Sequence, residues 1–245
     1  MNTKNAYRCA AAVARSIALC ALAGFAAADA PASGGTESSA ALYERMARLD
    51  AYLMPEPHAE IALARSAAPA AISDKATLLV LTPHGYEAAV TGTNGFTCLV
   101  ERSWMSPFDS PEFWNPKMRG PVCYNPAASK SILTYTLRRT KLALAGLSKA
   151  QMLDEIRVAV SRKALPWPEP GAMSFMMSKD GYLGDAQGHW HSHLMFHVPK
   201  ATAASWGANL PGSPVVLDDR DVPEPETIFL VPVAHWSDGT AALFQ

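Results

Sequence analysis

The residues most capable of chemistry stand in the stretch GHWHSHLMFH, residues 188–197. It holds four of the seven histidines of the chain: His189, His191, His193 and His197. Even numbers of residues separate them, so in a β-strand all four side chains lie on one face. The opposite face is apolar: Trp190, Leu194, Phe196 and Val198. The stretch therefore predicts a strand with one buried face and one histidine-rich face.

The histidine face predicts a transition-metal site, with zinc as the first candidate metal. Imidazole is the commonest metal-binding side chain, and two rings placed two residues apart on a strand can reach one ion. All four cannot bind one ion, since residues 189–197 span about 26 Å of extended strand. We expect His191 and His193 to be the ligand pair, with His189 as the next candidate. His235, in the last expected strand, is the candidate third ligand.

Two carboxylates precede the histidines, Asp180 and Asp185, in the loop before the expected strand. A carboxylate there can bind the ion or hold a ligand histidine in its orientation. A bound metal ion lowers the pKa of water and generates a nucleophile near neutral pH, so a metal-dependent hydrolase is the first functional hypothesis. An enzyme of this kind needs a carboxylate beside the ion, for which Glu101 is a further candidate, whereas a metal carrier does not.

Two other interpretations of the histidine stretch stay open. One is a non-catalytic exported module that binds a metal ion or a small molecule. The other is a polar strand face whose histidines only form hydrogen bonds with their neighbours. Methionine and histidine together can hold copper or haem, and four methionines lie near the stretch in sequence: Met173, Met176, Met177 and Met195. Methionines at alternating strand positions are more often core filler.

Known metal-binding motifs match the stretch only in part. WHSH resembles the start of the isopeptidase-type JAMM zinc motif, but Ala201 and Ala204 stand where that motif has Ser and Asp. A cupin has a Glu four or five residues after the first histidine of H-x-H, and here Met195 and Phe196 follow His191 at those positions. The sequence has no H-E-x-x-H, G-x-S-x-G, P-loop or G-x-G-x-x-G pattern. It therefore supports neither α/β-hydrolase chemistry nor nucleotide binding, and it does not identify a catalysed reaction.

The first residues predict export. Lys4, Arg8 and Arg15 are followed by an apolar stretch and then by small residues, which is typical of a secretory signal peptide over residues 1–28. An A-x-A cleavage site then makes Asp29 the first mature residue. No later stretch approaches the roughly 18–20 apolar residues of a membrane-spanning helix. We expect a periplasmic or secreted protein without a stable membrane anchor.

The charge and the length of the chain limit the kind of partner and the number of domains that we expect. Removal of residues 1–28 takes away three basic and no acidic side chains, so the formal charge moves from −1 to −4. No cluster of Lys and Arg remains to attract phosphates, so we expect no nucleic-acid partner. We expect residues 29–38 to form a flexible leader and residues 39–245 to form a single globular domain.

The cysteines of the mature chain predict one disulfide. Of four cysteines, two lie in the expected signal peptide, which leaves Cys98 and Cys123. An isolated pair in an oxidising compartment is expected to be bonded. The segment between them has no hydrophobic periodicity, so we expect a loop that the disulfide constrains.

The pattern of apolar residues predicts an α+β fold, with helices packed on a mainly antiparallel sheet of about six strands. Strands are expected over residues 76–82, 86–92, 96–102, 172–178, 190–198, 215–217 and 227–236, the first three as a meander. Helices are expected over residues 42–53, 58–68, 126–146 and 148–160. Ser148 and Gln151 form a capping-box pattern at the start of the last helix.

Three longer stretches resemble those of a family of exported bacterial proteins to which no activity is assigned. They are GTNGFTCLVERSWMSPFDSPEFWNPKMRGPVC, GAMSFMMSKDGYLGDAQGHWHSHLMFHVPK and WGANLPGSPV. The resemblance covers roughly residues 58–240. It implies a periplasmic or secreted single domain and transfers no activity.

Overall fold

An eight-stranded sheet organises the residues that the computed structural model describes, 43–185, 190–218 and 222–242. The strands are β1 (Thr77–Thr82), β2 (Gly85–Val90), β3 (Thr97–Glu101), β4 (Gly120–Tyr124), β5 (Met173–Met176), β6 (His193–Val198), β7 (Val216–Asp218) and β8 (Thr227–Pro232). Their order in the sheet is β2-β1-β3-β4-β5-β6-β8-β7. The pairing of β1 with β3 is parallel and the other pairings are antiparallel. The expected α+β class is confirmed, whereas the sheet is mixed and has more strands than expected.

The expected meander of the first three strands is wrong. β1 lies between β2 and β3, so the chain passes from β2 across β1 before it enters β3. The backbone N–H groups of Thr93 and Asn94 donate to the carbonyl of Lys75, which holds this crossing beside the start of β1. Burial explains the order: four of the five residues of β3 are buried, whereas the middle of β2 is exposed. The apolar strand occupies the interior of the sheet, and the polar strand takes its edge.

Strand β4 was not expected from the sequence. It lies at the end of the segment between the two cysteines, which was expected to be a loop, and all five of its residues are buried. Pro121 is part of it and pairs in register with Val100. Proline is rare in a central strand because it lacks a backbone N–H, so its presence argued against this assignment.

The helices agree with the sequence pattern in part: α2 and α6 were expected, the single helix expected over residues 126–146 is divided into α4 and α5, and α3 was not expected. They are α2 (Pro57–Arg65), α3 (Ala70–Ser73), α4 (Pro126–Lys130), α5 (Leu133–Leu144) and α6 (Lys149–Ser161), with 3-10 turns η1 (Leu49–Ala51), η2 (Ser103–Met105) and η3 (Ala203–Trp206). The capping box of Ser148 and Gln151 at α6 is confirmed. The helix expected over residues 42–53 is wrong: from residue 43 on, that segment holds only η1.

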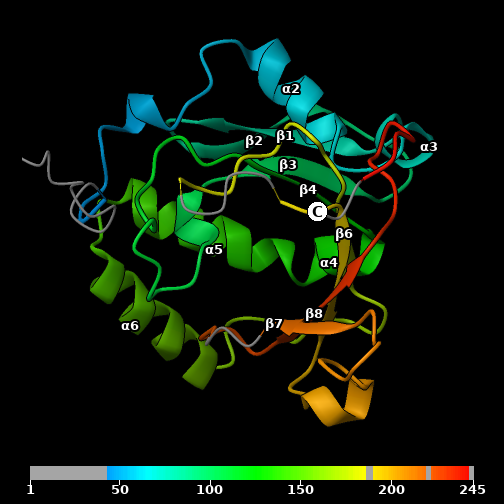
Figure 1. The fold of residues 1–245 in the computed structure, drawn as a ribbon. Helices are drawn as coiled ribbons and strands as arrows, with labels where there is room; N and C mark the ends of the chain where they lie inside the picture. The colour runs from blue at the N-terminus through cyan, green and yellow to red at the C-terminus, as the bar shows by residue number, and fades with distance from the viewer. Residues whose placement is uncertain (1–42, 186–189, 219–221, 243–245) are drawn as a thin grey trace, which may run out of the picture. The chain divides into compact units, whose positions relative to one another are not determined.

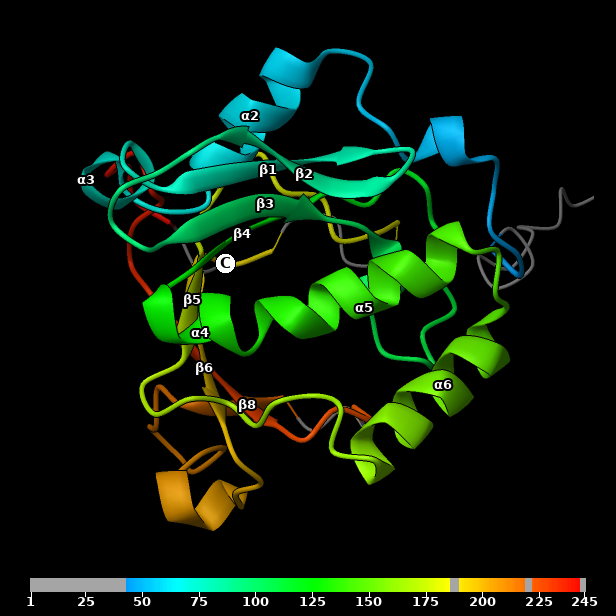
Figure 2. The ribbon, with the colours of Figure 1, turned by 180° about the vertical axis from the view of Figure 1, so that it is seen from behind.

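The sheet has a helix layer on each side. α2 packs on β1, β3 and β4, and α5 lies on the opposite side of these strands (Figure 1). The view from behind shows that β8 lies beyond α5, on the side away from β1–β4 (Figure 2). The twist of successive strands therefore curls the sheet around α5. Large buried side chains such as Trp104, Tyr124 and Met152 fill the core cluster.

The expected disulfide between Cys98 and Cys123 is present. The two cysteines are register partners in neighbouring strands, β3 and β4, and both are fully buried. The bond therefore joins the two strands that flank residues 102–119, besides closing that loop. The expected signal peptide and flexible leader lie outside the described residues. Within the described part of the chain, no helix has the length and apolar character needed to cross a membrane.

Candidate functional site

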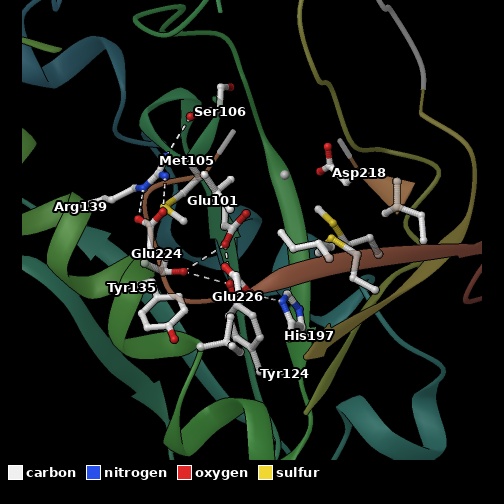
Figure 3. Close-up of a pocket in the computed structure, with 18 of the residues that line it drawn as sticks. Glu101, Met105, Ser106, Tyr124, Tyr135, Arg139, His197, Asp218, Glu224 and Glu226 are labelled. Carbon is white, nitrogen blue, oxygen red and sulfur yellow. Dashed lines mark hydrogen bonds and ion pairs between the residues drawn. The ribbon is translucent and has the colours of Figure 1, made fainter. Parts of the chain in front are cut away.

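A cavity of about 430 Å³ lies between α5 and the curled sheet. Its walls come from β3 to β8, from α5 and from the segment before β8, so residues far apart in sequence meet there (Figure 3). Four carboxyl groups line it: Glu101, Asp218, Glu224 and Glu226. Four methionines also line it: Met105, Met118, Met176 and Met195. The cavity thus combines acidic groups with a soft apolar surface.

Both arginines of the cavity wall are already paired with carboxylates. Arg139 of α5 holds Glu224 through two parallel contacts of 2.7 and 2.8 Å, with both side chains buried. Arg139 also donates to the carbonyl of Ser106 (Figure 3). Arg102 holds Glu60 at 2.8 Å, equally buried. Charge-assisted pairs of this geometry are the strong ones, so each guanidinium contacts mainly its own carboxylate.

Glu101 is held by hydroxyl groups. Its Oε1 accepts from Tyr124 Oη at 2.5 Å and from Thr136 Oγ1 at 3.1 Å. Figure 3 shows Glu101 between the Arg139–Glu224 pair and His197. Burial raises the pKa of the Glu101 carboxyl, because desolvation disfavours the ionised form more than these hydrogen bonds favour it. Burial, with the nearby Glu101 charge, also raises the pKa of Tyr124 well above its ordinary value.

His197 joins a chain of three polar side chains at one side of the cavity. Its Nδ1 lies 2.7 Å from Glu226 Oε2, and its Nε2 lies 3.0 Å from Ser174 Oγ. The order hydroxyl–imidazole–carboxylate is that of a hydrolytic triad. Ser174 is fully buried, however, and is not among the residues that line the cavity. The arrangement therefore positions His197 and does not present the serine to a substrate.

The expected ligand pair is divided between the cavity and the surface. His193 lines the cavity, and its Nδ1 lies 2.6 Å from the backbone oxygen of His191, whose side chain is exposed. His235 lies in an isolated bridge with Ala241, and its carbonyl accepts from Ser192 Oγ at 2.7 Å. His189 lies outside the described residues. Of the histidine face, the structure thus brings His193 and His197 to one cavity.

The two expected carboxylates have other contacts. Asp185 accepts hydrogen bonds from Tyr182 and, at 2.6 Å, from Tyr43, and these bonds lower the pKa of its carboxyl, that from Tyr182 the most. Its charge also lies 3.6 Å from Lys117 Nζ. Asp180 is exposed, and its backbone N–H donates to Ser178 Oγ. In the described ranges, no three side chains of His, Cys, Asp and Glu gather as an ion would require.

Sequence reasoning missed most of the polar residues of the cavity. On helix α5 the apolar Leu137 is 39% exposed, while the polar Thr136, Arg139 and Thr140 are buried. These three recur at helical spacing on one side of α5. A polar stripe on the buried side of a helix is the signal that could have located the site, since such groups need partners. Glu224 and Glu226 stand in no regular element and carried no signal.

No family model, no curated protein and no solved structure matches this chain.

Proposed function

We propose that this chain is an exported protein that binds a small organic cation in the cavity, with Glu101 as the group that meets the positive charge of the ligand. The observation that carries the proposal is the setting of Glu101. Two hydroxyl groups hold its carboxyl, and no Lys, Arg or His of the described residues forms an ion pair with it. Burial raises the pKa of its carboxyl, because desolvation outweighs the hydrogen bonds of Tyr124 and Thr136 and the more distant positive charges of His197 and Arg139.

The balance of charge in the cavity wall also favours a cationic ligand. Arg139 neutralises Glu224, and Arg102 neutralises Glu60 outside the cavity. Glu226 is paired with His197, whose Nδ1 lies 2.7 Å from Glu226 Oε2. An ammonium group beside Glu101 would place a positive charge in direct contact with it, which no Lys, Arg or His of the described residues does, and would lower the pKa of this carboxyl.

The size and apolar surface of the cavity support a small organic ligand. A volume of about 430 Å³ lies within the usual range of small-molecule sites. Tyr135 and Trp190 are among the lining residues of the cavity, and aromatic rings attract organic cations. The methionine side chains adapt to ligands of irregular shape. Export is supported by the signal-like first residues and by the buried Cys98–Cys123 disulfide.

Isothermal titration calorimetry with 2-phenylethylamine and its uncharged analogue 2-phenylethanol tests the proposal. We expect the amine to bind at least tenfold more tightly than the alcohol, with release of a proton from Glu101 that is seen as a dependence of the heat on the buffer. Glu101→Gln should weaken amine binding at least tenfold. Glu87→Gln is the matched control, because Glu87 is exposed on β2 outside the cavity.

Two results would overturn the proposal. One is equal binding of the amine and the alcohol, which would mean that charge plays no part. The other is full retention of amine affinity in Glu101→Gln. Failure of a panel of alkyl and aryl amines to bind the wild-type protein would have the same meaning.

A metal-dependent hydrolase that uses His191 and His193 is the second proposal. It is favoured by one contact: the Nδ1 of His193 bonds to a backbone carbonyl, as ligand histidines commonly do. Untagged protein dialysed against a weak chelator should then carry about one zinc per chain by elemental mass spectrometry, and the combined change of His191 and His193 to Ala should remove it. Metal-free wild-type protein that also fails to bind added zinc would contradict this second proposal.

A further inference from the structure

We propose that Met176, His193 and Met195 form a binding site for a soft monovalent metal ion, copper(I), in the wall of the cavity. The inference concerns a different group of residues from the Glu101 site and does not rest on it. It also differs from the sequence-derived zinc site, because it does not use the exposed His191.

The sheet register places the three side chains together. Met176 of β5 and His193 of β6 are direct partners in an antiparallel pair, and Met195 stands two residues further on the same face of β6. All three line the cavity. Direct antiparallel partners have Cβ atoms about 4.5–5.5 Å apart, and alternate residues of a strand lie about 7 Å apart. Long thioether side chains at such separations can converge with an imidazole on one ion.

The imidazole of His193 is oriented by its backbone contact. Its Nδ1 lies 2.6 Å from the backbone oxygen of His191, which can only accept, so Nδ1 is the donor in this contact. The ring of Trp190 packs edge-on to the His193 ring, with centroids 5.8 Å apart. Trp190 is itself fixed, since its Nε1 donates to the carbonyl of Ser178 at 2.6 Å. A ligand histidine is commonly held in this way by its second nitrogen.

The type of donor selects the metal. Two thioethers and one imidazole are neutral, soft ligands, and thioether sulfur favours copper(I) over zinc(II), magnesium or calcium. Met105 and Met118 add further sulfur atoms to the same cavity wall. Outside the cytoplasm, cysteine thiols are commonly oxidised to disulfides and then cannot bind copper. Methionine remains able to bind copper in an exported protein. The set therefore points to copper(I) rather than to the zinc that histidines alone would suggest.

The experiment is an anaerobic titration of the full chain with copper(I) in competition with bicinchoninate. We expect one tightly held copper(I) per chain. Met176→Leu, Met195→Leu and His193→Gln should each weaken binding at least tenfold, because each removes one of three donors. Met→Leu conserves volume and usually leaves a fold intact, which circular dichroism checks. Met173→Leu is the matched control, since Met173 lies on β5 but does not line the cavity.

His191→Ala separates this site from the zinc pair. The variant keeps the backbone oxygen that bonds His193, so copper(I) binding should not change, whereas the zinc pair would be lost. The inference is overturned if His191→Ala abolishes copper(I) binding, if the two Met→Leu variants bind as the wild type does, or if the wild type binds no copper(I).

A measurement on the wild-type protein covers the case in which a variant fails to fold. Silver(I) has the same ligand preference and no redox chemistry under these conditions. Its addition should shift the methyl resonances of Met176 and Met195 and leave that of Met173 unchanged. Equal shifts of all methionine methyls, or none, would overturn the inference.

Discussion

Glu101 is a carboxyl group whose hydrogen-bond partners, Tyr124 and Thr136, are both neutral. Hydroxyl groups stabilise a carboxylate less than a cation does, and the surrounding cavity removes water. The same side chain is therefore able to donate a proton when neutral and to accept a cation when ionised. Its neighbour His197 has both ring nitrogens engaged, so Glu101 is the group better placed to respond to a ligand.

The raised pKa of Glu101 predicts a pH dependence of stability. The folded state holds this proton more tightly than the unfolded state, whose carboxyl has the ordinary pKa of 4.5. The free energy of unfolding should therefore fall as the pH rises from this value through the folded pKa, and then level off. Urea unfolding of wild type and Glu101→Gln at a series of pH values measures the effect. If the difference between the two proteins does not change with pH, Glu101 does not have the raised pKa.

At the scale of the elements, α5 is the element on which the cavity depends. It supplies Tyr135, Thr136 and Arg139 to the wall, and Arg139 joins it to the segment before β8. A buried ion pair adds little net stability relative to apolar residues of the same size, but loss of one partner leaves a charge without compensation. The pair therefore fixes the position of α5 rather than simply strengthening the fold.

This reasoning predicts unequal effects of single and double substitutions. Glu224→Gln should lower the free energy of unfolding by about 3–5 kcal/mol, because it leaves Arg139 buried without a counter-charge. The double change of Arg139 and Glu224 to Met should recover most of that loss. Denaturant unfolding measures both.

An exposed ion pair on the same helix is the control. Arg138 of α5 and Glu155 of α6 lie 3.2 Å apart and are partly exposed to solvent. Glu155→Gln should cost only about 0–1 kcal/mol. Similar losses from Glu155→Gln and Glu224→Gln would show that burial does not distinguish the two pairs.

The elements that the sequence predicted well are those whose signals are local. The Ser148 capping box needs only residues within one turn of α6. A strand was also expected around residues 193–198 and is present as β6, but its expected buried apolar face is wrong: His197 is buried, whereas Leu194, Phe196 and Val198 are only partly buried. The buried face of α5 was not predictable in this way, because it depends on partners distant in sequence: Thr136 is buried beside Glu101, and Arg139 beside Glu224. A polar residue appears solvent-facing until the residue that satisfies it is known.

At the scale of the whole described chain, strand order and curl were not predictable from one sequence. Which strands pair depends on contacts between distant segments, as the parallel pairing of β1 with β3 illustrates. The α+β class was predictable from the pattern of apolar residues. The disulfide was predictable because Cys98 and Cys123 are the only cysteines outside the expected signal peptide. The cavity was not, because it exists only through the curl of the sheet around α5.

The Cys98–Cys123 bond predicts a loss of stability on its removal. Replacement of both cysteines by Ala should lower the free energy of unfolding by roughly 2–4 kcal/mol, since the bond restricts the unfolded chain across 25 residues of separation. Thermal unfolding of the double variant and of the wild type under non-reducing conditions measures this. An unchanged transition temperature would mean that the β3–β4 pairing alone holds the loop.

The residues that form the cavity wall are far apart in sequence. This separation determines how much of the chain must be synthesised before the cavity can form. Arg139 and Glu224 are 85 residues apart, and β8, which follows Glu224, is among the last strands of the chain. Consider a chain that has emerged from a ribosome or a translocation pore only as far as β6. It contains Glu101 and α5, but it lacks the part of the wall formed by β7, Glu224 and β8. Contacts of such sequence separation are slow to close. A chain truncated after β6 lacks Glu224 and β8, so the proposed ligand binding should be lost in the same assay.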